Sequence, residues 1–89
     1  MKHLNIRVSG KVQGVFFRAS ARDVARSLGL NGFVRNEPDG SVYIEAEGRD
    51  RELSQFEDWC KKGPPHAQVS GVQIEEGMVQ NFQYFNINR

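Results

Sequence analysis

The segment with the clearest chemical potential is a glycine-bounded loop that ends in an arginine. Residues 10–18 read GKVQGVFFR and lead from a strand-like pattern into a helical one. No Ser, Thr, Asp or Asn is placed to accept hydrogen bonds from the first N–H groups of this helix. Arg18 adds a positive charge to the first turn, against the helix dipole. Local rule-breaking of this kind indicates a functional site, here an anion site that suits phosphate.

A purely structural explanation of the same loop stays open. Gly10 and Gly14 could shape the turn, water could satisfy the N–H groups, and Arg18 could pair with a surface acid. The loop is not a Walker A loop, because no Lys-Ser/Thr pair follows Gly14. It is not a dinucleotide-binding fingerprint either, because the G-x-G-x-x-G pattern is absent.

The other reactive side chains offer little recognisable chemistry. Cys60 is the single cysteine, which excludes an intrachain disulfide and every metal site that needs several cysteines. Its place on the apolar stripe of a helix predicts a buried thiol. His3 and His66 lie far apart without metal-ligand spacing, and we expect both at the surface.

Charge and composition narrow the possible partners and compartment. The formal net charge is only +1, although residues 1–36 carry seven basic side chains and one acidic one. A nucleic-acid-binding domain is usually more basic, and no RNA-recognition motif is present, so we expect no nucleic-acid partner. No apolar run approaches the roughly 18 residues of a membrane span, and residues 1–20 lack a signal-peptide core. We therefore expect a cytoplasmic monomer without a membrane partner.

The elements that must position the loop follow from hydrophobic periodicity. Alternation and helical spacing predict strands over 3–9, 32–36, 41–47, 68–75 and 85–87, and helices over 17–28 and 50–62. Asp50 is the expected N-cap of the second helix, and a phase break near Ser70 predicts a β-bulge. The order β-α-β-β-α-β, plus a short last strand, predicts a ferredoxin-like split βαβ sandwich, an α+β fold with two helices on one face of an antiparallel sheet. Residues 1–89 are expected to form one domain.

Four segments together resemble the acylphosphatase family. Residues 10–18 resemble its phosphate-loop signature, and residues 32–42, GFVRNEPDGSV, resemble its second signature. Residues 63–69 and 85–87 resemble the segment after its second helix and its last strand, so that the likeness extends from Leu4 to the C-terminus. The resemblance implies hydrolysis of the carboxyl–phosphate bond of small-molecule acyl phosphates to a carboxylate and inorganic phosphate. It also implies that no metal and no cofactor take part.

The resemblance further implies the site residues. Its catalytic arginine and asparagine fall on Arg18 and Asn36. Its phosphate-cradling backbone amides fall on Gln13, Gly14, Val15, Phe16, Phe17 and Arg18. An amide side chain does not titrate, so Asn36 would hold the attacking water rather than deprotonate it. Glu37 could tune the approach of that water.

Two questions remain open at this level. Whether Asn36 lies beside the start of the first helix depends on the strand order, which the sequence does not prove. The alternative function is a non-catalytic module that binds phosphate or carbamoyl phosphate, of the kind found at the start of larger carbamoyl-transferring proteins. Because no further domain follows residue 89, we expect the stand-alone enzyme instead.

Overall fold

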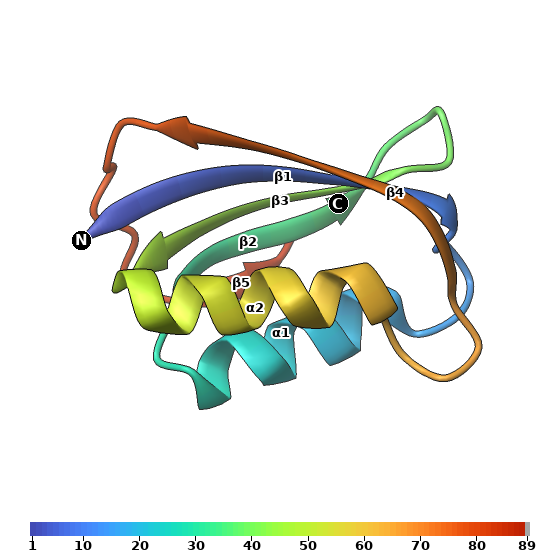
Figure 1. Cartoon of the computed structure of the whole chain (residues 1–89), viewed down its shortest axis with the longest axis horizontal. Helices are drawn as coiled ribbons and strands as arrows, with labels where there is room; N and C mark the ends of the chain where they lie inside the picture. The colour runs from blue at the N-terminus through green and yellow to red at the C-terminus, as the bar shows by residue number, and fades with distance from the viewer. Residues whose placement is uncertain (89) are drawn as a thin grey trace.

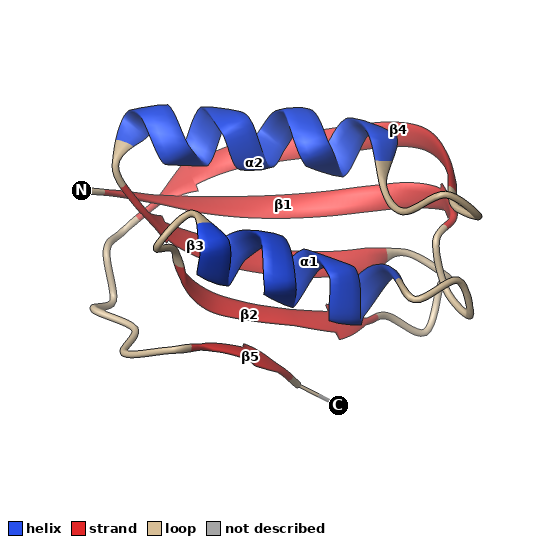
Figure 2. Ribbon diagram, turned by 90° about the horizontal axis from the view of Figure 1, so that it is seen from below, coloured by secondary structure: helices blue, strands red, loops and turns tan. Residues whose placement is uncertain are grey.

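The computed structural model describes residues 1–88, which form five strands and two helices. Both helices cover the same face of the sheet (Figures 1 and 2). The elements are β1 (Lys2–Lys11), α1 (Phe17–Ser27), β2 (Asn31–Asn36), β3 (Val42–Gly48), α2 (Asp50–Lys62), β4 (Gln68–Gly77) and β5 (Phe85–Ile87). No helix within the described chain combines the length and apolar character that a membrane crossing requires.

The strand order β4-β1-β3-β2-β5 confirms the ferredoxin-like sandwich. Strand β3 pairs antiparallel with both β1 and β2, and β4 pairs antiparallel with β1. The sheet is nevertheless mixed rather than wholly antiparallel, because β5 joins the edge parallel to β2. Strands β1, β2 and β5 therefore run in one direction, and their C-terminal ends lie at the same end of the sheet.

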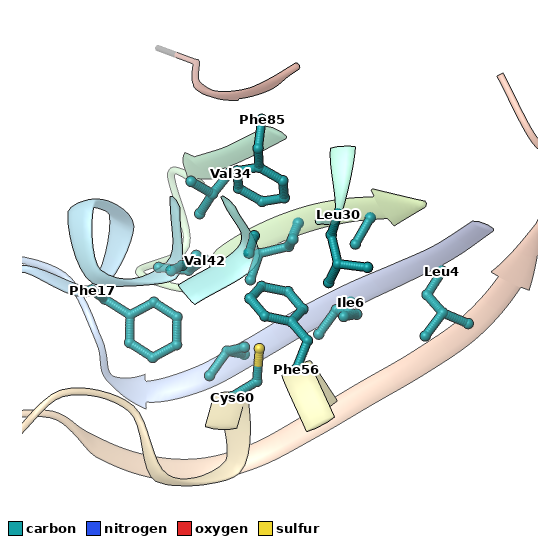
Figure 3. Packing of buried hydrophobic residues seen from close by; sticks show 14 of the residues in the cluster. Leu4, Ile6, Phe17, Leu30, Val34, Val42, Phe56, Cys60 and Phe85 are labelled. Carbon is teal, nitrogen blue, oxygen red and sulfur yellow. The ribbon is translucent and has the colours of Figure 1, made fainter. Parts of the chain in front are cut away.

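The core lies between the helices and the sheet (Figure 3). Alternate residues of the central strands, such as Ile6 and Ile44, meet Phe17 of α1 and Phe56 of α2, and all four are almost completely buried. Burial of each such side chain stabilises the fold by about 1.5–3 kcal/mol. Cys60 lies in the same layer, and burial raises the pKa of its thiol far above the usual range. This confirms the prediction of a buried thiol.

Local sequence signals were right about the bulge and wrong about one helix cap. Opposite β1, Ser9 pairs with Gly71 and Gly10 with Val69, which leaves Ser70 as the extra residue. The predicted N-cap Asp50 is instead the first residue of α2. The preceding Arg49 has an extended backbone, and its carbonyl already accepts the first helical hydrogen bond. Asp50 therefore acts as a favourable charge in the first turn, and its carboxylate also lies 3.6 Å from Lys2 Nζ.

His3 is buried, which corrects the expectation that it lies at the surface. Strands β4 and β5 occupy opposite edges of the sheet, so the segment 78–84 must pass across one end of it (Figure 2). That segment covers His3, and the ring centroid of Phe82 lies 5.9 Å from the imidazole. Periodicity placed His3 on the outer face correctly, but it could not show that a later segment covers this part of the face.

Glu47 fastens the covering segment to the sheet. One carboxylate oxygen accepts a hydrogen bond from His3 Nδ1 at 2.7 Å, and the backbone N–H groups of Gln80 and Phe82 also donate to this carboxylate. His3 Nε2 lies 2.8 Å from Asn5 Oδ1. Both imidazole nitrogens thus face acceptors, an arrangement that only the doubly protonated ring satisfies.

The pKa values of the pair follow from these contacts. Burial disfavours protonated His3, but the hydrogen bonds to Glu47 and Asn5 and the nearby carboxylates outweigh it and raise the pKa of His3. Burial likewise disfavours ionised Glu47, but the hydrogen bonds from Gln80, His3 and Phe82 outweigh it and lower the pKa of Glu47. Protonated His3 and ionised Glu47 therefore stabilise one another.

We predict a pH-dependent stability that depends on His3. Its stabilising contribution is complete below its ordinary pKa of 6.5 and is lost as the pH rises through the raised value. The contribution of Glu47 is complete above its ordinary pKa of 4.5 and is lost as the pH falls through the lowered value. Guanidinium unfolding should give a larger free energy of unfolding at about pH 5.5 than at about pH 8.5. In His3→Gln this difference should shrink; an unchanged difference would contradict the assignment.

Candidate active site

A cleft lies at the end of the sheet where three strands finish. Strands β1, β2 and β5 finish here, and α1 begins here, because it follows β1 after a short loop. The cleft has a volume of about 670 Å³. Its lining consists of Val12, Gly14, Phe16, Phe17, Arg18, Ala19, Asn36 and Ile87. The strand order thus brings together Arg18 and Asn36, whose proximity the sequence left open.

The N-terminus of α1 borders this cleft without a side-chain cap, as predicted. Phe16 is the N-cap residue, makes no capping hydrogen bond, and has a left-handed backbone with φ of 65°. No acidic residue lies in the first turn. The left-handed backbone of Phe16 costs a non-glycine residue about 1–2 kcal/mol. The Phe16 side chain is also 78% exposed. An exposed aromatic residue with a strained backbone at the mouth of a cleft is a local cost without a structural benefit of its own.

The side chains of Arg18 and Asn36 reach the cleft from different elements. Arg18 lies in the first turn of α1, is half-buried, and forms no ion pair with any residue from 1 to 88. Asn36 ends β2 opposite Val42 of β3. Its Oδ1 atom is buried and accepts no hydrogen bond from the described residues. Since buried polar atoms are nearly always paired, this oxygen is suited to accept a hydrogen bond from a ligand or water.

Of the remaining predicted loop residues, Gly14, Phe16 and Phe17 line the cleft, whereas Gln13 and Val15 do not. Val15 turns its side chain into the core and Gly14 adopts a φ of 73°, which suits glycine. Gln13 directs its side chain away from the loop, towards the turn that follows β2. Sequence reasoning assigned only a backbone role to Gln13 and missed this contact. It also missed Ile87, which reaches the cleft because β5 runs parallel to β2.

The structure does not bring Glu37 into the cleft. Its carboxylate lies 3.1 Å from Arg35 Nε and 3.7 Å from Arg7 Nη2, and it is absent from the cleft lining. The suggestion that it tunes the approach of water therefore finds no support in the geometry. Arg26, two turns further along α1 than Arg18, donates a hydrogen bond from Nε to the carbonyl of Phe85 at 3.1 Å.

No cluster within the described residues has the composition of a metal site. Nowhere in residues 1–88 do three or more His, Cys, Asp or Glu side chains gather closely enough to hold an ion. His66 is exposed, and His3 is engaged with Glu47. For a ligand the cleft holds Asn36 Oδ1 as an acceptor and, beside it, a set of donors: the guanidinium of Arg18 and the backbone N–H groups at the start of α1. Such a set suits an anion with several oxygens.

Comparison with known proteins agrees with this chemistry. The family model for acylphosphatase matches residues 4–87. An acylphosphatase from Archaeoglobus fulgidus is 48% identical over 84 residues, which cover 94% of this chain and 94% of that protein. One from Thermotoga maritima is 49% identical over 87 residues, which cover 98% and 97%. The crystal structure of acylphosphatase from Bacillus subtilis matches all of both chains with a TM-score of 0.98 and 34% identity. This chain therefore belongs to the acylphosphatase family.

Proposed function

We propose that Arg18, Asn36 and the backbone of residues 13–18 carry out the acyl phosphate hydrolysis that this enzyme performs. The observation that carries the proposal is the shared cleft. A positively charged, uncapped helix start faces an asparagine whose buried oxygen has no partner in residues 1–88. The helix start suits the phosphoryl group, and Asn36 suits the attacking water.

The phosphoryl group binds at the start of α1. Its oxygens accept hydrogen bonds from backbone N–H groups that no side chain caps. Arg18 adds a two-pronged contact from its guanidinium group. The backbone donors are fixed before the substrate arrives, because the neighbouring side chains of Val15 and Phe17 are buried in the core. Together with Arg18 they hold the negative charge of the transition state. The loop and Arg18 therefore both bind the substrate and stabilise its transition state.

The water is held by Asn36. Its Oδ1 accepts a hydrogen bond from the water, which attacks phosphorus in line with the departing carboxylate. The phosphorus–oxygen bond to the acyl group breaks as the new one forms. The proton of the water passes to an oxygen of the substrate itself, because Asn36 cannot accept it. A carboxylate leaves unprotonated at neutral pH, so the reaction needs no general acid from the protein.

Surface charge and the single thiol bear on the compartment and partners of the enzyme. We propose that residues 1–89 act as one domain and as a monomer in the cytoplasm, on small-molecule acyl phosphates. The small net charge supports the absence of a nucleic-acid partner, and the mixed surface charge supports a monomer without a membrane partner. A single cysteine that is buried and unpaired is compatible with a reducing compartment.

We predict that Arg18→Gln abolishes both phosphate binding and turnover. With benzoyl phosphate as substrate and excess EDTA present, the wild type should release phosphate at an unchanged rate. Arg18→Gln should lower kcat by about 10³-fold or more, because it removes the charge that faces the transition state. Arg22→Gln is the matched control, since Arg22 lies one turn further along α1 and pairs with Asp23. Equal losses in both variants would contradict the role of Arg18.

We predict that Asn36→Ala separates binding from chemistry. The variant should lose about 10²–10³-fold in kcat, because the water is no longer oriented. Inorganic phosphate should still bind and still protect the protein against thermal unfolding, because the helix start and Arg18 remain. Near-normal turnover in Asn36→Ala would refute its assignment. A wild-type protein that binds phosphate without turnover would instead indicate the non-catalytic module.

A further inference from the structure

The side chain of Gln13 joins the two halves of the site. Its Nε2 atom donates to the carbonyl of Glu37 at 2.8 Å and to that of Ser41 at 2.9 Å. Both partners are carbonyl oxygens, which only accept hydrogen bonds, so the amide nitrogen and not the oxygen must face them. Both N–H bonds of the amide are thereby used. The contact joins residues 24 and 28 positions apart in the sequence.

The turn to which Gln13 donates, residues 37–41, is stabilised by hydrogen bonds of its own. Glu37 N–H donates to the Ser41 carbonyl at 2.9 Å, and Gly40 N–H donates to the Glu37 carbonyl at 3.1 Å. The hydroxyl and the backbone N–H of Ser41 both donate to Asp39 Oδ1. Glu37 directly follows Asn36 in the chain. Gln13 is therefore bonded to a well-ordered turn whose first residue adjoins the water-holding asparagine.

The two halves need such a connection because a strand separates them. The phosphate loop follows β1, Asn36 ends β2, and β3 lies between these strands. Two strand spacings place the ends of β1 and β2 roughly 10 Å apart. Among residues 1–88, hydrogen bonds between the loop 12–18 and the segment 36–41 come from Gln13 alone.

We propose that the Gln13 side chain is a positioning residue that sets the spacing between the phosphoryl group and the water held by Asn36. The inference rests on the proposed function, because it takes the roles of Arg18 and Asn36 from it. Binding of phosphate uses only the loop and Arg18, whereas hydrolysis requires that the loop and Asn36 keep their relative position. Loss of the Gln13 contact should therefore affect kcat and leave phosphate affinity in place.

The test is Gln13→Met, which keeps the length of the side chain and removes both donors. Its backbone N–H is unchanged. We expect kcat for benzoyl phosphate to fall by about tenfold to a hundredfold, as for a small misplacement of reacting groups. The inhibition constant of inorganic phosphate should stay at the wild-type value. Gln13→Glu, which turns an acceptor towards the two carbonyl oxygens, should lose more and gives a second result if the Met variant fails to fold. Gln55→Met, an exposed position on α2, is the matched control and should leave both constants unchanged.

A double mutant separates positioning from general weakening of the fold. Once Asn36 is gone there is no water to align, so Gln13→Met/Asn36→Ala should lose no more kcat than Asn36→Ala alone. Losses that multiply independently would overturn the proposal, as would a phosphate affinity that falls together with kcat. If Asn36→Ala keeps its turnover, the proposed function itself fails. If Asn36→Ala loses turnover while Gln13→Met keeps it, only the role of Gln13 is refuted.

Discussion

The antiparallel pairing of β3 with both β1 and β2 is the constraint from which the site follows. Two strands that each run antiparallel to a common neighbour must run parallel to one another. Strands β1 and β2 therefore finish at the same end of the sheet. Helix α1 follows β1 and must therefore start at that end. β5 adds a third end there, because it pairs parallel with β2. Residues contributed by three parts of the chain meet without any loop having to reach far.

The His3–Glu47 pair and the cleft lie at opposite ends of the sheet and differ in how their polar groups are hydrogen-bonded. At the end where β1 begins, the carboxylate of Glu47 and the ring of His3 are fully occupied, and they fasten segment 78–84 onto the outer face. At the opposite end, Asn36 Oδ1 has no partner within the described chain, and the first turn of α1 lacks a cap. Satisfied polar groups stabilise a fold, whereas unsatisfied ones are available to a ligand. Glu52 Oε1, in the first turn of α2, is likewise buried without a partner in residues 1–88, so the cleft is distinguished by Asn36 and the uncapped helix start lying together.

The strained loop is supported by its neighbours. Phe16 has a left-handed backbone, but Val15 before it and Phe17 after it are both buried in the core. Phe17 also packs against Trp59 of α2, with ring centroids 5.2 Å apart. Such anchors hold a strained residue in a conformation that it would not adopt in isolation. The same core that stabilises the sandwich therefore also fixes the loop before α1.

Much of the fold was predictable from the sequence because its signals are local. Alternation along strands, the stripe of α1 and the phase break at Ser70 each involve residues a few positions apart, and the structure confirms them. The errors arose where distant parts of the chain decide. His3 is covered by a segment from the other end of the chain, and the edge strand β5 runs parallel to its neighbour. Asp50 missed its expected place by one residue, a difference that capping preference alone does not resolve.

The sequence by itself determined the elements, the uncapped helix start and the placement of Arg18 in the first turn, because each depends on neighbouring residues. The resemblance to acylphosphatases singled out Asn36 but could not place it in space. Only the tertiary structure decided that Asn36 shares a cleft with Arg18, that Glu37 turns towards two arginines, and that Gln13 bonds to the turn after β2. Apart from the local Arg35–Glu37 pair, these contacts join residues about 20 or 30 positions apart. They exist because strand pairing, not proximity along the chain, determines which strand ends lie together.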